Sequence, residues 1–271
     1  MRPAVRRAAA VLRPSAHVIR SMDVVPRLTI IGWHRIDSHI DGLSTPADVF
    51  QHQLDALERW GATVLCLDEA VRRRAAGALP PRTVALTFDD GYASVLEKAW
   101  PLLRERHLPA TLFAVSGYVD GDRRFPWDHA TAGDHTRLST ADELRDAARQ
   151  GLDIGSHTVT HRWLPRLDAA ELKRELVESR AALEDMTGRP VPSIAYPTGG
   201  WNAVVRAAAA EAGYDTGITV DRGRNSAGHD RLSLRRAFAP DTVEDFELLL
   251  DGAYTWLRPF DRWRMRDRAM S

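Results

Sequence analysis

The feature of this sequence that most limits its fold is a regular alternation of short apolar segments with longer amphipathic ones. The short segments predict strands, and the segments between them repeat apolar residues at helical spacing. Strands separated by helices predict a parallel sheet with right-handed crossovers. The predicted strands are 27–33, 62–67, 83–88, 110–115, 152–156, 191–196, 216–220 and 231–238. The predicted helices are 45–60, 68–76, 95–106, 140–150, 168–186, 203–212 and 242–250.

About seven strand–helix units in 271 residues fit a single α/β barrel or a doubly wound sheet. An apolar fraction of 44% is enough to bury the core that such a fold needs. The sequence contains no convincing linker, so we expect one domain over residues 25–252. An N-terminal extension, 1–24, would precede it, and a basic-aromatic tail, 253–271, would follow.

The two ends of the chain lead to an expectation about location. The apolar stretch near the N-terminus covers only residues 8–12, shorter than the roughly 7–15 residues of a secretory core. We therefore expect no signal peptide, and a cytoplasmic or membrane-peripheral protein. In the tail, Trp256, Phe260 and Trp263 fall near one helical face among arginines, which would suit contact with a membrane surface. Pro259 interrupts that helix and favours packing against the barrel instead.

The charge balance and the single cysteine exclude two classes of function. Thirty-seven basic residues match thirty-seven acidic ones, so we expect no nucleic-acid partner bound by phosphate neutralisation. One cysteine, Cys66, can form neither an internal disulfide nor a cysteine-based zinc site.

The first group of candidate site residues is Asp89, Asp90 and Gly91, which directly follow the predicted strand 83–88. Adjacent side chains on a strand point in opposite directions. At a strand end, however, Gly91 allows a tight turn that can bring both carboxylates to one side. An ordinary solvated turn is the alternative, because Asp-Gly pairs are common in turns.

The second group is a pair of histidines, His157 and His161, which follows the predicted strand 152–156. If this turn is helical, their Cβ atoms lie about 5–6 Å apart. Neutral imidazoles are frequent ligands of Zn²⁺. The pair therefore indicates a metal site.

The third group is segment 194–201, Ile-Ala-Tyr-Pro-Thr-Gly-Gly-Trp, at the end of another predicted strand. Its proline and paired glycines predict a rigid loop with backbone amides free to donate, although an ordinary strand-to-helix turn has the same composition. All three groups follow strands, and the loops at the carboxyl ends of parallel strands converge. We therefore expect them to form one site.

In this order, the three groups closely resemble the motifs of the polysaccharide deacetylase family, carbohydrate esterase family 4, whose shared unit is the NodB homology domain. The resemblance covers roughly residues 81–250, and segment 28–35 resembles the strand and Tyr-His-Arg that precede this domain in many bacterial members. It implies a distorted (β/α) barrel with fewer than eight strands, in agreement with our count of about seven. It also implies a metal-dependent hydrolase that removes N-acetyl groups from an acetylated sugar in a polysaccharide or glycolipid.

The resemblance also implies roles for individual residues. Asp89 would be the catalytic base, and Asp90, His157 and His161 would bind one divalent metal ion, most commonly Zn²⁺. Two histidines and one carboxylate leave a coordination position for water and substrate. The metal would activate that water and polarise the acyl carbonyl, while Asp89 accepts the proton. A backbone amide near Thr198 would help to stabilise the oxyanion.

The sequence departs from the family pattern at two places. The arginine that commonly lies two residues before the proline of the third motif is replaced by Ala195, and the late Leu-x-His that supplies a general acid is missing. A branch resembling exopolysaccharide and poly-N-acetylglucosamine deacetylases shares both departures and carries Leu-Pro-Arg where this chain has Leu234-Arg235-Arg236. If the strand face that holds Leu234 and Arg236 points inward, Arg236 reaches Asp89 and acts as the second catalytic residue. A solvated pair of arginines is the alternative.

Because that histidine is missing, the group that protonates the leaving amine is not identified. The candidates are a metal-bound water, His34 and His229. Trp127 could stack on a sugar ring, because flat apolar sugar faces pack well on aromatic rings. The residues that we expect to contact substrate are Tyr196, Pro197, Thr198, Trp127 and His34.

Several other functions are compatible with the same residues. An O-acetyl esterase or an amidase acting on a non-sugar substrate would share the fold and the motifs. The two missing family residues suggest a weakened glycan-binding relic, whereas the intact Asp89 argues for catalysis. A non-haem iron oxygenase also uses two histidines and one carboxylate. We expect an acetylated carbohydrate as the partner and make no prediction of the oligomeric state.

Overall fold

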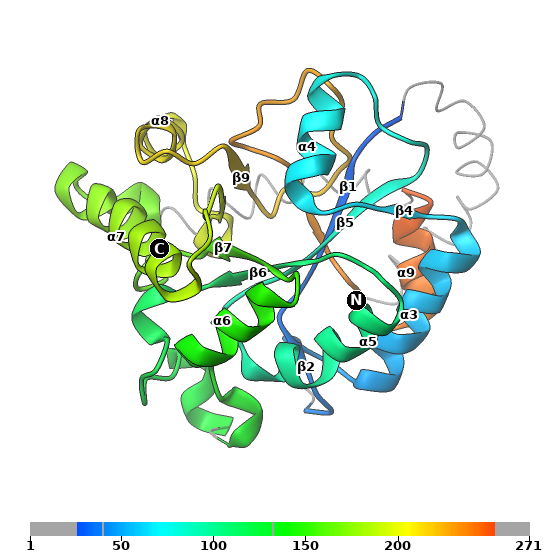
Figure 1. The fold of residues 1–271 in the computed structure, drawn as a ribbon, viewed down its shortest axis with the longest axis horizontal. Helices are drawn as coiled ribbons and strands as arrows, with labels where there is room; N and C mark the ends of the chain where they lie inside the picture. Colours follow the sequence, from blue (N-terminus) through cyan, green and yellow to red (C-terminus); the bar gives the residue numbers. More distant parts are fainter. Residues whose placement is uncertain (1–25, 40, 132, 253–271) are drawn as a thin grey trace.

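A curled parallel sheet forms the centre of the protein, which this computed structural model describes over residues 26–39, 41–131 and 133–252 (Figure 1). The spatial order of its strands is β10-β1-β5-β6-β7-β8-β9, and the short β4 pairs with the first half of β5. The predicted distorted (β/α) barrel is therefore confirmed. The strands are β1 (Thr29–Trp33), β4 (Thr63–Val64), β5 (Thr83–Phe88), β6 (Thr111–Ala114), β7 (Asp153–Ser156), β8 (Ser193–Ala195), β9 (Thr216–Ile218) and β10 (Ala237–Phe238).

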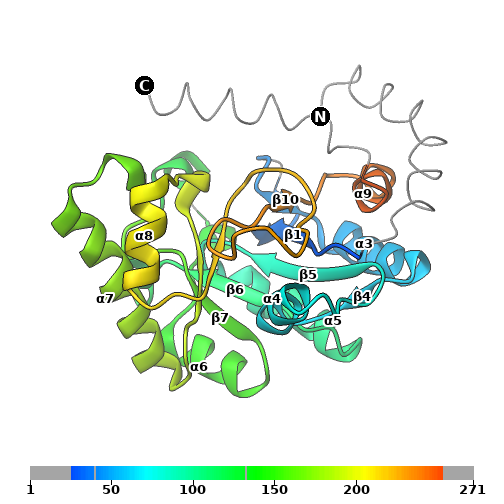
Figure 2. The ribbon, with the colours of Figure 1, turned by 90° about the horizontal axis from the view of Figure 1, so that it is seen from above.

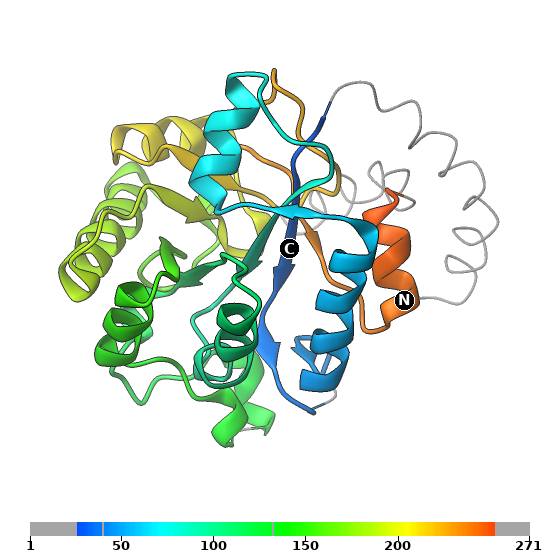
Figure 3. The same cartoon turned by 45° about the vertical axis from the view of Figure 1, so that its right-hand side comes forward.

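Most of the helices surround the sheet on its outer side (Figures 2 and 3), whereas α4 (Leu67–Ala75) packs against strand residues of the other face, among them Ile30 and Ala85. Two of the helices begin with capping boxes, which are led by Thr140 and Asp168. Among the described helices, none has the length and apolar character needed to cross a membrane. The helices are α3 (Ala47–Trp60), α4 (Leu67–Ala75), α5 (Trp100–Glu105), α6 (Ala141–Arg149), α7 (Ala169–Thr187), α8 (Ala203–Glu211) and α9 (Val243–Leu250).

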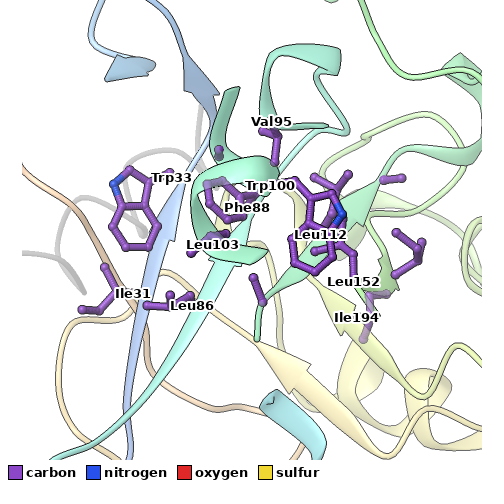
Figure 4. Close-up of a cluster of buried hydrophobic side chains, with 14 of the residues drawn as sticks. Ile31, Trp33, Leu86, Phe88, Val95, Trp100, Leu103, Leu112, Leu152 and Ile194 are labelled. Atoms are coloured by element: carbon purple, nitrogen blue, oxygen red, sulfur yellow. The ribbon is translucent and has the colours of Figure 1, made fainter. Parts of the chain in front are cut away.

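The main hydrophobic core fills the space between the sheet and these helices (Figure 4). The rings of Trp33 on β1 and Phe88 on β5 stack with their centroids 5.5 Å apart. The Trp33 indole donates a 2.9 Å hydrogen bond to the buried Gln53 of α3, so its polar atom is satisfied inside the core. This packing fixes the strands whose ends carry the candidate site.

The predicted strand 231–238 is mostly irregular. Only Ala237 and Phe238 form a strand, because loop residues take the hydrogen bonds of the preceding backbone. The Asn225 side chain accepts from the amide of Arg235 at 2.9 Å, and the amide of Arg236 donates to the carbonyl of Asp221 at 3.0 Å.

This irregular stretch closes the barrel. Leu234 forms a parallel bridge with Ile218 at one edge of the sheet. Three residues later, Ala237 pairs with Ile31 of β1 at the other edge. We call residues 234–237 the closing segment, because it links the two edges that would otherwise stay apart.

The structure does not describe some residues that carried expectations. The predicted extension 1–24 and tail 253–271, with Trp256, Phe260 and Trp263, lie outside the described residues. Their predicted roles stay predictions.

Candidate active site

The chemical groups expected from the sequence gather at the carboxyl ends of neighbouring strands. His34 follows β1, Asp89 follows β5 and His157 follows β7. The amide of Asp89 donates to the carbonyl of Trp33 at 2.9 Å, which continues the pairing of β5 with β1. In parallel α/β folds this end of the sheet is where sites are built.

An unusual turn brings the two aspartates to the same region. Asp90 and Gly91 both have left-handed backbone conformations, with φ angles of 73° and 81°. The reversal at Asp90 breaks the alternation of a strand, so its carboxylate need not point away from that of Asp89. A Cβ atom at Gly91 would also lie only 3.3 Å from Ala114, so this position suits glycine on both counts.

The two histidines come together without the helical turn that was considered for them. The turn is irregular rather than helical, and His161 has a left-handed φ of 59°. Its shape is held by Glu175, a buried residue of α7, which accepts hydrogen bonds from the amides of Val159 and Thr160, each at 2.9 Å. Glu175 also accepts a hydrogen bond from the Thr160 hydroxyl. Glu175 could not be predicted from the sequence, because the pattern of a helix does not show that one of its glutamates binds a turn 15 residues earlier.

Asp90, His157 and His161 fit the requirements of a single metal ion. The Nε2 atoms of both histidines lie 3.5 Å from Oδ1 of Asp90, and the three donor atoms lie within 4.8 Å of one another. Ligands about 2.0 Å from a tetrahedral ion are separated by about 3.3 Å, close to these distances. His157 Nδ1 lies 2.7 Å from the carbonyl oxygen of Ala195, which fixes the tautomer and directs Nε2 toward Asp90.

The electrostatics of these three side chains also suit a cation. Burial lowers the pKa of His157, and lowers that of His161 to about 3, so both imidazoles are neutral and can act as ligands. Burial raises the pKa of Asp90 well above its usual range, and the carboxylates of Asp89 and Asp128 raise it further. Among the described side chains that contact Asp90, none carries a positive charge that would balance its buried carboxylate. A bound metal ion would provide that charge.

Asp89 is in the opposite situation, because Arg236 contacts it directly. The guanidinium donates to both carboxylate oxygens of Asp89, at 2.6 Å each, and both side chains are fully buried. Burial alone would raise the pKa of Asp89, but the charge and hydrogen bonds of Arg236 outweigh it and lower the pKa to about 2. A Cβ atom at Gly32 would lie 2.9 Å from the Phe238 ring and 3.2 Å from the Arg236 side chain, so glycine leaves room for both side chains beside β1.

The expected substrate-contacting residues divide into buried and accessible ones. Tyr196 is fully buried and donates its hydroxyl to the carbonyl of Leu232 at 2.8 Å, and Pro197 is also buried. Thr198 is exposed and has a left-handed φ of 51°. The Trp127 side chain is 41% exposed, and its ring lies 5.0 Å from that of His161.

The two histidines considered as proton donors lie at opposite ends of the sheet. His34 follows β1 beside Asp89, and its ring stacks on Phe238 with centroids 4.5 Å apart. His229 belongs to the loop after Asn225, which pairs with Leu28 before the start of β1. Only His34 is thus at the end of the sheet that carries Asp89.

The fold and the site together define a (β/α)-barrel enzyme. A family model described as polysaccharide deacetylase matches residues 76–217, which is just over half of the chain. The chain therefore belongs to the polysaccharide deacetylase family, as its motifs suggested, and with it to the hydrolases that act on carbon–nitrogen bonds other than peptide bonds.

Sequence relatives agree with this assignment. YxkH of Bacillus subtilis (strain 168), provisionally named a polysaccharide deacetylase, is 26% identical over 211 residues, which cover 78% of this chain and 70% of YxkH. The poly-beta-1,6-N-acetyl-D-glucosamine N-deacetylase of Staphylococcus aureus (strain MRSA252) is 26% identical over 169 residues, or 59% of this chain. That match spans only 55% of the length of the staphylococcal protein.

Solved structures share the fold. IcaB from Ammonifex degensii superimposes with a TM-score of 0.73 at 23% identity, covering 84% of this chain and 97% of IcaB. The Streptococcus pyogenes deacetylase PplD, solved in complex with acetate, superimposes with a TM-score of 0.70 at 24% identity, covering 81% of this chain and 96% of PplD. At these identities the likeness establishes the architecture.

Proposed function

We propose that this protein is a metal-dependent deacetylase that hydrolyses the N-acetyl group of an acetylated amino sugar within a glycan. One observation carries the proposal: a buried Asp–His–His set suited to a metal ion lies next to an aspartate that an arginine keeps ionised. The name of the staphylococcal relative supports an N-acetylglucosamine polymer as the substrate class.

Asp90, His157 and His161 would hold the metal ion, and their mixed nitrogen and oxygen donors favour Zn²⁺. When bound there, such an ion would polarise the acyl carbonyl and make an attacking water more acidic. Tying His157 to the carbonyl of Ala195 orients one ligand in advance, and Glu175 does the same for the turn that carries the other.

Asp89 would accept the proton of the attacking water. With a pKa of about 2 it is ionised at neutral pH, as a base must be before reaction. Arg236 would hold the carboxylate in one orientation through two parallel hydrogen bonds, which is the geometry that guanidinium provides best. It would thereby replace the arginine that the family carries at the position of Ala195.

His34 would relay to the leaving nitrogen the proton that Asp89 accepts from the attacking water. Burial lowers the pKa of His34 to about 4, so the ring is neutral at rest and is free to take up and pass on a proton during the reaction. Thr198 and Trp127 are the exposed residues best suited to contact the acetylated sugar.

The test of this function is acetate release from N-acetylglucosamine oligomers, measured with and without a chelator. We expect release by the purified protein, loss of release in EDTA and recovery when Zn²⁺ is added back. Acetylated xylan should release much less acetate. Release from xylan alone would favour the O-acetyl esterase, and activity unaffected by complete metal removal would contradict the proposal.

We predict that His34→Gln lowers kcat for acetate release about 10²-fold, because the leaving amine loses its proton source. His52→Gln, an exposed histidine of α3, serves as the control and should retain the parent rate. Steady-state kinetics on N-acetylglucosamine oligomers measures both. A His34→Gln variant with the kcat of the parent would remove His34 from the mechanism.

A further inference from the structure

A chain of hydrogen bonds joins the exposed Trp127 to three side chains buried behind it. Trp127 Nε1 donates to the Tyr92 hydroxyl at 3.1 Å, and that hydroxyl donates to Oδ2 of Asp128 at 2.7 Å. Oδ1 of Asp128 accepts from Arg35 of β2 (Arg35–Ile36) at 2.7 Å. The Arg35 guanidinium also lies 4.9 Å from the centre of the Tyr92 ring and pairs with Asp41.

The donor and acceptor types of these groups fix the direction of each hydrogen bond in the series. The Asp128 carboxylate is held by a guanidinium and can only accept, so the single hydroxyl proton of Tyr92 points toward it. The remaining lone pairs of Tyr92 then face Trp127, whose indole nitrogen can only donate. Tyr92 and Asp128 are therefore set to hold the indole at one tilt, and Arg35, Tyr92 and Asp128 are all buried, where such bonds are strong.

The aromatic contacts of Trp127 show which side of its ring is available. Phe125 lies parallel to it, with ring centroids 4.6 Å apart and an interplanar angle of 5°, and so covers one face. His161 meets the indole at 5.0 Å and 65°, beside the metal site. Trp127 is still 41% exposed, so a ring that contacts the metal ligand His161 keeps part of its surface open to solvent.

We infer that Tyr92 and Asp128 are positioning residues, which fix Trp127 as a platform for the apolar face of a pyranose ring next to the metal site. This inference rests on the proposed function. Sugar–aromatic stacking depends on the tilt of the ring, and a tilt fixed in advance avoids the cost of ordering the side chain on binding. Tyr92 is also two residues from Asp90, so the same turn sets the metal ligand and the platform.

The test compares Tyr92→Phe with the parent on N-acetylglucosamine oligomers and on p-nitrophenyl acetate, which has no sugar ring. Loss of the hydroxyl frees the indole, so we expect KM for the oligomers to rise about three- to tenfold while kcat changes less than about twofold. The kcat/KM for p-nitrophenyl acetate should change less than about twofold. Equal losses on both substrates, or no change in KM, would overturn the inference.

Two further variants isolate the path of the effect. In a Trp127→Ala background, Tyr92→Phe should raise KM no further, because the tyrosine acts only through the tryptophan. Tyr118→Phe is the matched control: its ring stacks on Phe125 at 4.6 Å in the same cluster, and the substitution should leave KM at the parent value. Additive effects of Tyr92→Phe and Trp127→Ala would overturn the inference.

Binding measured without catalysis separates this inference from the proposed function. Calorimetric titration of the EDTA-treated protein with the oligomers should show weaker affinity for Tyr92→Phe than for the parent. If the parent neither binds nor deacetylates the oligomers, the proposed function fails and this inference falls with it. If the parent does both and Tyr92→Phe binds equally well, only this inference is wrong.

Discussion

Asp89→Asn is expected to lower acetate release at least about 10³-fold, the largest loss that we predict for a single side chain. Asparagine keeps the size of the residue and one acceptor for Arg236, but it cannot accept the proton of the attacking water. General-base catalysis is typically worth about 10²–10⁴-fold, and the two hydrogen bonds from Arg236 hold the carboxylate in one orientation for this role. Acetate release under single-turnover conditions measures the loss directly.

Asp153→Asn is a suitable control for this variant. Asp153 begins β7, so it lies on the same sheet but at the end opposite the candidate site. It should keep the rate of the parent, and circular dichroism should show that both variants are folded. An Asp89→Asn protein that releases acetate at the parent rate would show that another group is the base.

Arg236→Met is expected to weaken the fold by about 3–5 kcal/mol, because it leaves the buried Asp89 carboxylate without its partner. Urea unfolding at neutral pH measures this change. In the parent, burial raises the pKa of Asp89, but the charge and hydrogen bonds of Arg236 outweigh it, and the pKa falls from 3.8 to about 2. The resulting stabilisation is therefore present above about pH 4 and is lost as the pH falls toward 2.

The same substitution should change the pH dependence of activity. Without Arg236, burial is no longer opposed, so the pKa of Asp89 rises and the base becomes protonated at a higher pH. We expect kcat/KM of Arg236→Met to fall on acidification at a higher pH than kcat/KM of the parent. Arg236→Lys should shift less, because it keeps the charge, and the neighbouring Arg235→Met should follow the parent. Identical profiles for Arg236→Met and the parent would disprove the coupling.

The local motifs of the site could be predicted from sequence, because the reactive residues of each motif lie close together along the chain. Two carboxylates before a glycine, and two histidines after a strand, place ligands at strand ends whatever the detailed turn. The alternation of Leu234 with Arg236 left an inward arginine and a solvated one both open, and the structure places the Arg236 guanidinium on Asp89. The helical turn considered for His157 and His161 does not form, because Glu175, a residue distant in sequence, binds the amides of an irregular turn instead.

The remaining errors and omissions also involve partners that are far apart along the chain. The strand expected over 231–238 is short because the Asn225 side chain takes the backbone hydrogen bonds of Arg235. The bond between Arg35 and Asp128 links residues 93 positions apart, and no local pattern marks either residue for the other. The two-residue β2 and its partner β3 (Ser44–Thr45) are too short to show any periodicity.

The closing segment makes the closure of the barrel and the charge of Asp89 depend on the same four residues. Its four residues connect the two edges of the sheet, at β9 and β1. One of them is Arg236, which keeps Asp89 charged. If the closing segment opens locally, the Arg236 guanidinium moves away with it. The Asp89 carboxylate then becomes an unpaired buried charge, which favours protonation. Local opening of these four residues would therefore inactivate the site even while the surrounding helices are still intact.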